Sequence, residues 1–85
     1  MATEVKIYTK SACPYCVRAK ELFSRRGVKF EEISVDGNDA LREEIRERYD
    51  WPTVPVIVIG GRCVGGYTDV AKLEASGELT RLLAA

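Results

Sequence analysis

The first part of the chain passes from an alternating pattern of apolar and polar residues to a helical spacing and back. The segment 4–9 (EVKIYT) alternates with the period of a strand. Pro14 then stands at the first position of a predicted helix, and Gly27 is placed to end it in the left-handed conformation. The apolar face of this helix consists of Cys16, Ala19, Leu22 and Phe23. The segment 28–35 (VKFEEISV) predicts a second strand, so the pattern indicates a βαβ unit with parallel strands.

A second amphipathic helix follows. Residues 36–39 (DGND) are turn formers that place acidic groups at a helix N-terminus. The pair Trp51-Pro52 ends the helical pattern, because proline cannot continue a helix. Between these limits, apolar residues recur at four-residue steps at Leu41, Ile45 and Tyr49.

The remaining pattern predicts a hairpin and an interrupted helix. Segments 56–59 and 62–64 are joined by two glycines at 60–61, which is typical of a two-residue hairpin. A last helical region begins near Thr68, breaks at Ser76-Gly77 and resumes. The order β-α-β-α-β-β-α predicts an α/β protein with a thioredoxin-like fold, in which helices cover both faces of a four-stranded mixed sheet.

Composition and charge exclude several classes of function. With 85 residues we expect a single domain over residues 1–85. The 13 basic and 13 acidic residues cancel and are interspersed, so no basic face for nucleic acid is predicted. No run reaches the roughly 18 apolar residues of a membrane span, and the N-terminus opens directly into strand-like sequence. We expect a soluble, cytoplasmic protein with no nucleic-acid or membrane partner.

The strongest chemical signal is Cys13-Pro14-Tyr15-Cys16, placed where a predicted strand passes into a helix. The Cys13 sulfur stands just outside the helix, where unpaired N–H groups and the positive end of the dipole favour a thiolate, and Lys10 adds positive charge. Cys16 lies one turn further on the same face, within reach of a disulfide formed by Cys13. We therefore predict that Cys13 is a nucleophile and that Cys16 resolves the disulfide it forms.

Two other uses of these cysteines stay open, as small buried hydrophobic residues or as half of a zinc site. A structural zinc site needs four ligands, and the chain has three cysteines and no histidine. A carboxylate would have to complete such a site, so we predict no metal. The third cysteine, Cys63, is interpreted as a buried small residue, with a regulatory thiol as the alternative.

Three motifs in sequence order carry a resemblance to a known family. Cys13-Pro14-Tyr15-Cys16 is followed by Thr53-Val54-Pro55 and then by Gly-Gly-Tyr-Thr-Asp at 65–69. In this order, and at these places in the predicted pattern of elements, they resemble the glutaredoxin family of the dithiol, Cys-Pro-Tyr-Cys type. The resemblance covers essentially the whole chain.

The resemblance implies a glutathione site. It places Pro55 after a cis peptide bond beside the cysteines and leaves the Val54 backbone to pair with the cysteinyl part of glutathione, flanked by Thr53. The positions of Thr68 and Asp69 hold the γ-glutamyl end in this family. The remaining implied contacts are Lys10 near the glycine carboxylate, Tyr15 along the groove, and Gly66, where, as at Gly65, the backbone comes close to the ligand.

The implied activity is glutathione-dependent reduction of glutathione mixed disulfides and protein disulfides. Glutathione is then a co-substrate, no cofactor is tightly bound, and glutathionylated or disulfide-bonded proteins, ribonucleotide reductase among the compatible ones, are partners of a monomer. Two alternatives stay open: a thioredoxin-type reductase fed by a flavoenzyme, and a glutaredoxin that binds a [2Fe–2S] cluster. Trp51-Pro52 departs from the polar or basic residues that many relatives carry, so a glutathione contact from that segment is not predicted.

Overall fold

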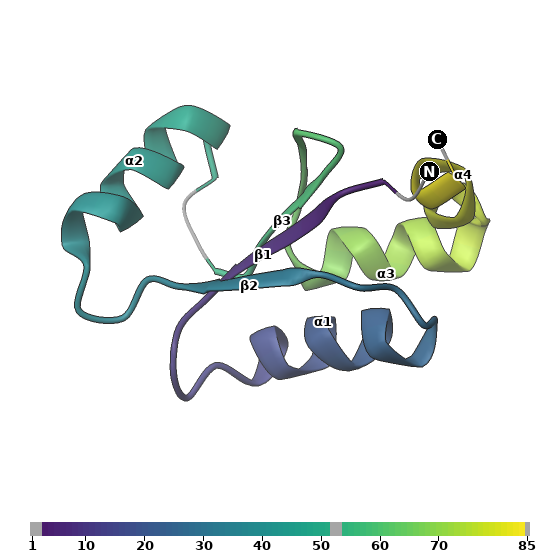
Figure 1. Ribbon diagram of the computed structural model, residues 1–85, viewed down its shortest axis with the longest axis horizontal. Helices are drawn as coiled ribbons and strands as arrows, with labels where there is room; N and C mark the ends of the chain where they lie inside the picture. The colour runs from purple at the N-terminus through teal and green to yellow at the C-terminus, as the bar shows by residue number, and fades with distance from the viewer. Residues whose placement is uncertain (1–2, 52–53, 85) are drawn as a thin grey trace.

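The computed structural model of the protein describes residues 3–51 and 54–84, which form one mixed sheet flanked by helices (Figure 1). The elements are β1 (Val5–Thr9), α1 (Pro14–Arg25), β2 (Glu31–Ser34), α2 (Asp39–Tyr49), β3 (Val56–Ile59), β4 (Arg62–Gly65), α3 (Tyr67–Ser76) and α4 (Glu78–Ala84). The predicted order of elements is confirmed, including the break in the last helical region, which lies at Gly77 in the left-handed conformation.

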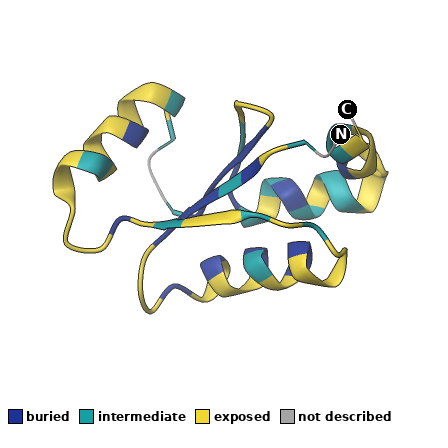
Figure 2. Ribbon diagram, in the orientation of Figure 1, coloured by how far each residue is buried: buried dark blue, intermediate teal, exposed yellow. Residues whose placement is uncertain are grey.

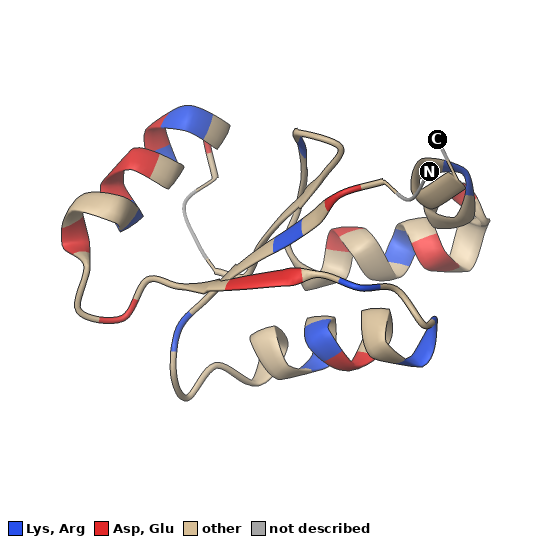
Figure 3. Cartoon of the chain, viewed as in Figure 1, with Lys and Arg blue, Asp and Glu red and all other residues tan. Residues whose placement is uncertain are grey.

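The sheet has the strand order β2-β1-β3-β4. β1 pairs with β2 in parallel and with β3 antiparallel, and β3 pairs with β4 antiparallel. The βαβ unit therefore supplies the parallel pair and the hairpin supplies the antiparallel pair, as predicted. The central position of β1 and β3 leaves β2 and β4 as edges, and Figure 3 shows β2 carrying acidic residues, which oppose pairing with another chain.

Helices cover both faces of the sheet, which confirms the predicted thioredoxin-like fold (Figures 1 and 2). On one face, α1, α3 and α4 pack against β1 and β3 around buried residues such as Ile7, Phe23 and Ile57. On the other face, α2 contributes Ile45 to a smaller cluster with Tyr8 and strand β3. Because a fully buried aliphatic or aromatic side chain stabilises a fold by roughly 1.5–3 kcal/mol, these two clusters hold the sheet between its helices.

The second strand is shorter than the predicted 28–35, because it pairs with β1 only between Glu31 and Ser34. The preceding residues serve the end of α1 instead: Gly27 is left-handed at φ +69° and the Val28 N–H donates to the Phe23 carbonyl at 3.0 Å. Other boundaries shift by one residue: β1 starts after residue 4, β4 extends to residue 65 and α3 starts at residue 67. None of the described helices combines the length and the apolarity that a bilayer-crossing segment needs.

Candidate active site around Cys13

Cys13 is the N-cap of α1, with extended backbone angles (φ −111°, ψ 102°) and Pro14 at the start of the helix. Its sulfur accepts a hydrogen bond from the Cys16 backbone N–H at 3.3 Å. The Cys13 carbonyl accepts from the Val17 N–H at 3.2 Å, so the helix ladder begins at this residue. The Cys13 sulfur therefore lies at the N-terminus of α1, beside the first N–H groups of the helix.

Cys16 lies on the inner face of α1 and is 1% exposed, whereas Cys13 is 8% exposed. Burial raises the pKa of the Cys16 thiol from 9.0 to about 11, and the hydrogen bond with Cys13 adds to the increase. At neutral pH the Cys16 thiol therefore holds its proton. The two sulfurs occupy different environments although they are separated by one helical turn.

The peptide bond between Val54 and Pro55 is cis, and it lies beside the cysteines. The Val54 carbonyl oxygen is 4.0 Å from the Cys13 sulfur. The structure thus brings together two motifs that are far apart in the sequence. Thr53, which we also assigned to this site, lies outside the described residues.

The start of α3 forms the third part of the site. Gly66 is the N-cap, and its N–H donates to Oδ2 of Asp69 at 3.1 Å, which is the carboxylate half of a capping box. Gly65 has φ +110°, and a Cβ on it would lie 2.7 Å from the same Oδ2. The glycine at 65 is therefore required by the backbone angle and by the space that Asp69 fills.

A groove of about 530 Å³ connects these three parts. It contains six of the residues predicted to bind glutathione, namely Lys10, Tyr15, Val54, Pro55, Gly66 and Thr68, together with Cys13. Asp69 does not line the groove. Its carboxylate accepts from the Gly66 N–H at the α3 N-terminus instead. The Tyr15 side chain is 52% exposed and stacks on Tyr67, with ring centroids 6.0 Å apart.

Five lining residues were not assigned to the site from the sequence: Ala12, Pro14, Arg42, Trp51 and Tyr67. Arg42 is one of several charged residues on the polar side of α2, and nothing in the sequence separates it from the others. Trp51 packs against the α2-side cluster and also lines the groove, although no glutathione contact was predicted from this segment. The Gly-Gly-Tyr-Thr-Asp motif did contain Tyr67, and its stacking on Tyr15 depends on the tertiary fold.

The loop before Cys13 is held by polar contacts to the end of β2. Ser11 donates from its backbone N–H and its hydroxyl to the Asp36 carboxylate, and these bonds lower the pKa of Asp36. Ala12, between Ser11 and Cys13, has φ +54°, which is unusual for a residue with a side chain. This backbone conformation was not predicted from the sequence, and it sets the direction in which the chain enters α1.

A network of hydrogen bonds connects β1, β2 and α1 through the Glu32 side chain. The Glu32 carboxylate accepts from the Lys20 ammonium at 3.0 Å and from the Thr9 hydroxyl at 2.8 Å. These hydrogen bonds, that from Lys20 first, lower the pKa of Glu32. The network borders a second groove that reaches both cysteines from the β2 side.

Cys63 lies away from the groove. It packs beside the α2-side cluster in β4, is half-buried, and has a pKa raised by that burial. Within residues 3–51 and 54–84, no three His, Cys, Asp or Glu side chains come together as metal ligands would.

Known proteins resemble this chain along nearly its full length. A family model described as Glutaredoxin matches residues 5–64. Glutaredoxin 3 of Escherichia coli (strain K12) is 51% identical over 79 residues, which cover 93% of this chain and 95% of that protein. A glutaredoxin of Pseudomonas aeruginosa is 49% identical over 81 residues, covering 95% of this chain and 96% of that protein.

A solved structure shows the same fold. The crystal structure of a buckwheat glutaredoxin–glutathione complex matches with a TM-score of 0.90 at 29% identity, and the match covers 96% of this chain and 77% of that chain. The architecture that positions Cys13 beside Val54 is therefore that of a solved relative with glutathione bound.

Proposed function

This chain belongs to the glutaredoxin family and is a glutathione-dependent thiol–disulfide oxidoreductase, and we propose that Cys13 is the nucleophile of its reaction. The single observation that carries the proposal is the position of the Cys13 sulfur at the α1 N-terminus, with the Cys16 N–H donating to it at 3.3 Å. N–H groups at a helix N-terminus are donors that a thiolate accepts from, and the thiolate is the attacking species in thiol–disulfide exchange.

With a glutathione mixed disulfide, the Cys13 thiolate attacks the glutathionyl sulfur. The bond between that sulfur and the target breaks, the target leaves as a thiolate that takes a proton, and Cys13 becomes glutathionylated. A second glutathione thiolate then attacks the glutathionyl sulfur on Cys13, which forms glutathione disulfide and restores the Cys13 thiolate. This route does not use the Cys16 thiol.

With a protein disulfide, Cys13 forms a mixed disulfide with one sulfur of the target. Cys16 then attacks the Cys13 sulfur, releases the target as a dithiol and leaves an internal Cys13–Cys16 disulfide. Two glutathione molecules reduce this disulfide in two steps and become glutathione disulfide. Because burial raises the pKa of the Cys16 thiol to about 11, Cys16 must lose its proton as it attacks.

For glutathione itself we propose an extended pose along the groove. The Val54 backbone pairs with the cysteinyl residue, flanked by Thr53 and Pro55, because the Val54 carbonyl oxygen lies 4.0 Å from the Cys13 sulfur. The γ-glutamyl end lies at the α3 N-terminus, where free N–H groups of Thr68 and Asp69 receive its carboxylate, and the negative charge of Asp69 at this helix end attracts its ammonium.

The remaining contacts complete this pose. Gly66 allows close approach of the ligand, Tyr15 lines the groove, and Lys10 takes the glycine carboxylate. We further propose that residues 1–85 act as one monomeric domain in the cytoplasm, where a glutathione pool supplies the reductant.

A coupled assay tests the proposal. Reduction of a small glutathione mixed disulfide, with glutathione and glutathione reductase, is measured for the native protein, Cys13→Ser and Cys16→Ser. We expect activity to vanish in Cys13→Ser and to persist in Cys16→Ser, whereas reduction of a protein disulfide requires both cysteines. Cys63→Ser is the matched control and retains both activities, because its sulfur lies outside the groove.

Two results would favour the two alternative functions that the sequence left open. A native protein that is inactive with glutathione and reduces insulin with thioredoxin reductase would be a thioredoxin-type reductase. A brown protein after anaerobic purification, whose colour depends on Cys13 and glutathione, would indicate a [2Fe–2S] cluster instead.

A further inference from the structure

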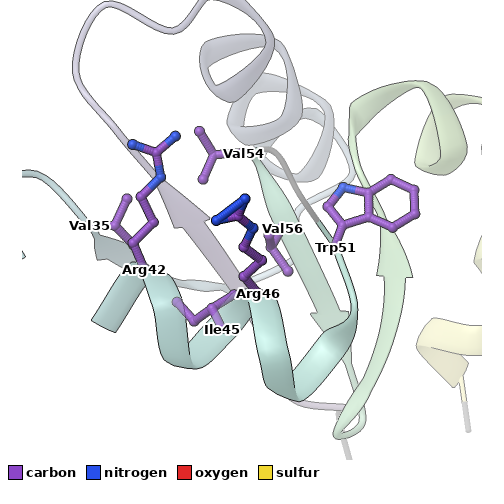
Figure 4. Close-up of a pocket in the computed structure, with 7 residues that line it drawn as sticks. All are labelled: Val35, Arg42, Ile45, Arg46, Trp51, Val54 and Val56. Atoms are coloured by element: carbon purple, nitrogen blue, oxygen red, sulfur yellow. The ribbon is translucent and has the colours of Figure 1, made fainter. Parts of the chain in front are cut away.

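A smaller pocket of about 100 Å³ lies next to the groove, between α2 and β3 (Figure 4). Its walls are the apolar residues Val35, Ile45, Val54 and Val56, together with Trp51. Among the lining residues that the structure describes, the only charged side chains are those of Arg42 and Arg46, which extend from α2 toward Val54 (Figure 4). The pocket is thus apolar inside and positively charged at its rim.

This pocket continues the groove and does not stand apart from it. Arg42, Trp51 and Val54 line both, whereas Gly66 and Thr68, at the start of α3, line only the groove. A chain that starts at the α3 N-terminus and passes over Val54 is therefore led toward α2 and into this pocket. Glutathione ends at its glycine, one residue after the cysteine, but a protein substrate bound in the same direction continues.

The period of an extended chain determines which substrate residue enters the pocket. Alternate side chains point to the same side, and residues two apart are about 7 Å apart along the strand. If the substrate cysteine faces Cys13, the side chain two positions later also faces the protein. Cavities of about 150 Å³ accommodate a benzene ring, so a pocket of about 100 Å³ suits a branched aliphatic side chain.

The charge at the rim determines what should follow that side chain. Arg46 pairs with Glu43 at 3.0 Å, and both side chains are more than half exposed, so this pair is open to exchange with a ligand. Arg42 adds a second positive charge one helical turn away. Two arginines against one carboxylate leave the rim positive, and it is therefore complementary to an acidic residue.

We call this pocket the α2 subsite; Arg46, Ile45 and Val35 line it and do not line the groove. We propose that the α2 subsite binds the segment of a protein-disulfide substrate that follows its reactive cysteine. The favoured segment carries a branched aliphatic residue two positions after the cysteine and an acidic residue next. The inference rests on the function proposed above, because it uses the direction assigned to glutathione. It adds a substrate class: disulfide proteins with the pattern cysteine, any residue, aliphatic, acidic.

Symmetric disulfides of short blocked peptides test the subsite. The reference peptide has the sequence Ala-Cys-Gly-Leu-Glu, and its partners replace Leu by Ser or Glu by Gln. Cys13 attacks one sulfur of the disulfide and releases one peptide thiol, and Cys16 then releases the second. We expect kcat/KM to fall about tenfold for the Ser peptide, because aliphatic burial is lost. For the Gln peptide we expect a threefold to fivefold decrease, the size of an exposed ion pair.

Charge reversal on the protein gives an independent readout. Arg46→Glu should remove the preference for Glu over Gln in the peptide and lower kcat/KM for the Glu peptide at least fivefold. Arg48→Glu is the matched control: it makes the same charge change in the same helix, but Arg48 lies against Tyr49 and does not line the subsite. Thermal unfolding of both variants checks that α2 is intact.

A small glutathione mixed disulfide separates the two proposals. Arg46→Glu should leave its reduction unchanged. Equal kcat/KM for the three peptides, or equal effects of Arg46→Glu and Arg48→Glu, would overturn the subsite while leaving the glutathione reaction intact. If Arg46→Glu slows the small disulfide as much as the peptide, Arg46 belongs to the glutathione site and the subsite is overturned. A native protein without glutathione-dependent activity would overturn the proposed function and the subsite with it.

Discussion

The Cys16 backbone N–H donates to the Cys13 sulfur at 3.3 Å, while the Cys16 thiol is itself buried. Cys16 thus donates a hydrogen bond to the Cys13 sulfur from its backbone, while its own thiol keeps its proton. The hydrogen bond arises because Cys13 caps the N-terminus of α1. The proton is retained because the Cys16 thiol is buried on the inner face of the same helix. This difference in environment fits the proposed roles, in which Cys13 attacks the substrate first and Cys16 reacts only after a mixed disulfide has formed.

The raised pKa of Cys16 predicts a dependence of stability on pH. Its folded value of about 11 lies above the unfolded 9.0, so this contribution is fully present below pH 9 and is lost as the pH rises toward 11. At 1.36 kcal/mol per pKa unit the loss is about 2–3 kcal/mol. Urea unfolding should therefore show a steeper decline of the free energy of unfolding over this range for the native protein than for Cys16→Ala.

Cys63→Ala is the control for that measurement, because it removes a thiol of raised pKa and leaves Cys16 in place. The free energy of unfolding of Cys63→Ala should still fall with rising pH nearly as steeply as that of the native protein. Parallel curves for the native protein and Cys16→Ala would contradict the assignment of this pH dependence to Cys16.

Gly65→Ala should destabilise the protein and weaken the glutathione site. The residue has φ +110°, and the added Cβ would lie 2.7 Å from Asp69 Oδ2, so both the backbone and the α3 cap must shift. We expect a loss of about 2–3 kcal/mol in urea unfolding and a raised KM for the glutathione mixed disulfide.

Gly61→Ala is the matched control for this substitution. Gly61 has φ +80°, and nothing lies within 4 Å of its added Cβ, so the variant carries strain without a collision. It should lose only about 1 kcal/mol and keep its KM. Equal losses for the two variants would show that the contact with Asp69 costs nothing.

Substitutions of Asp69 should separate its two roles. Its carboxylate accepts from the Gly66 N–H at 3.1 Å, and in the proposed pose its negative charge attracts the γ-glutamyl ammonium. Asp69→Ala should lower stability by about 1 kcal/mol and raise KM, because both roles are lost. Asp69→Asn keeps an oxygen acceptor, so it should regain most of the stability while KM stays high. If Asn restored KM as well, the charge would have no part in binding.

Ala12→Gly tests the left-handed residue before Cys13. A residue with a side chain at φ +54° carries about 1–2 kcal/mol of steric cost, which glycine removes, against about 0.5–1 kcal/mol of extra entropy in the unfolded chain. We expect stability to be unchanged or to rise by up to about 1 kcal/mol in urea unfolding. Ala19→Gly, inside α1, should instead lose at least about 1 kcal/mol. A loss in Ala12→Gly as large as that in Ala19→Gly would argue against a strained backbone at Ala12.

Much of the fold was predictable because local patterns dictate local structure. Proline after Cys13 starts α1, two glycines at 60–61 turn the hairpin, and Gly77 separates α3 from α4. The error at β2 has a tertiary cause. Its predicted first residues have strand-like character, but β1 is too short to pair with them, and Val28 bonds to the end of α1 instead.

The sequence by itself determined the order of the elements, the helix N-terminus under Cys13 and the spacing that places Cys16 one turn away, since these depend on neighbours along the chain. Only the tertiary structure decided which distant groups meet: Val54 beside the Cys13 sulfur, Arg42 in the groove, and the burial that holds the Cys16 proton. These relationships arise where separate segments pack across the sheet, and the distances between their atoms are not written in the pattern of any one segment.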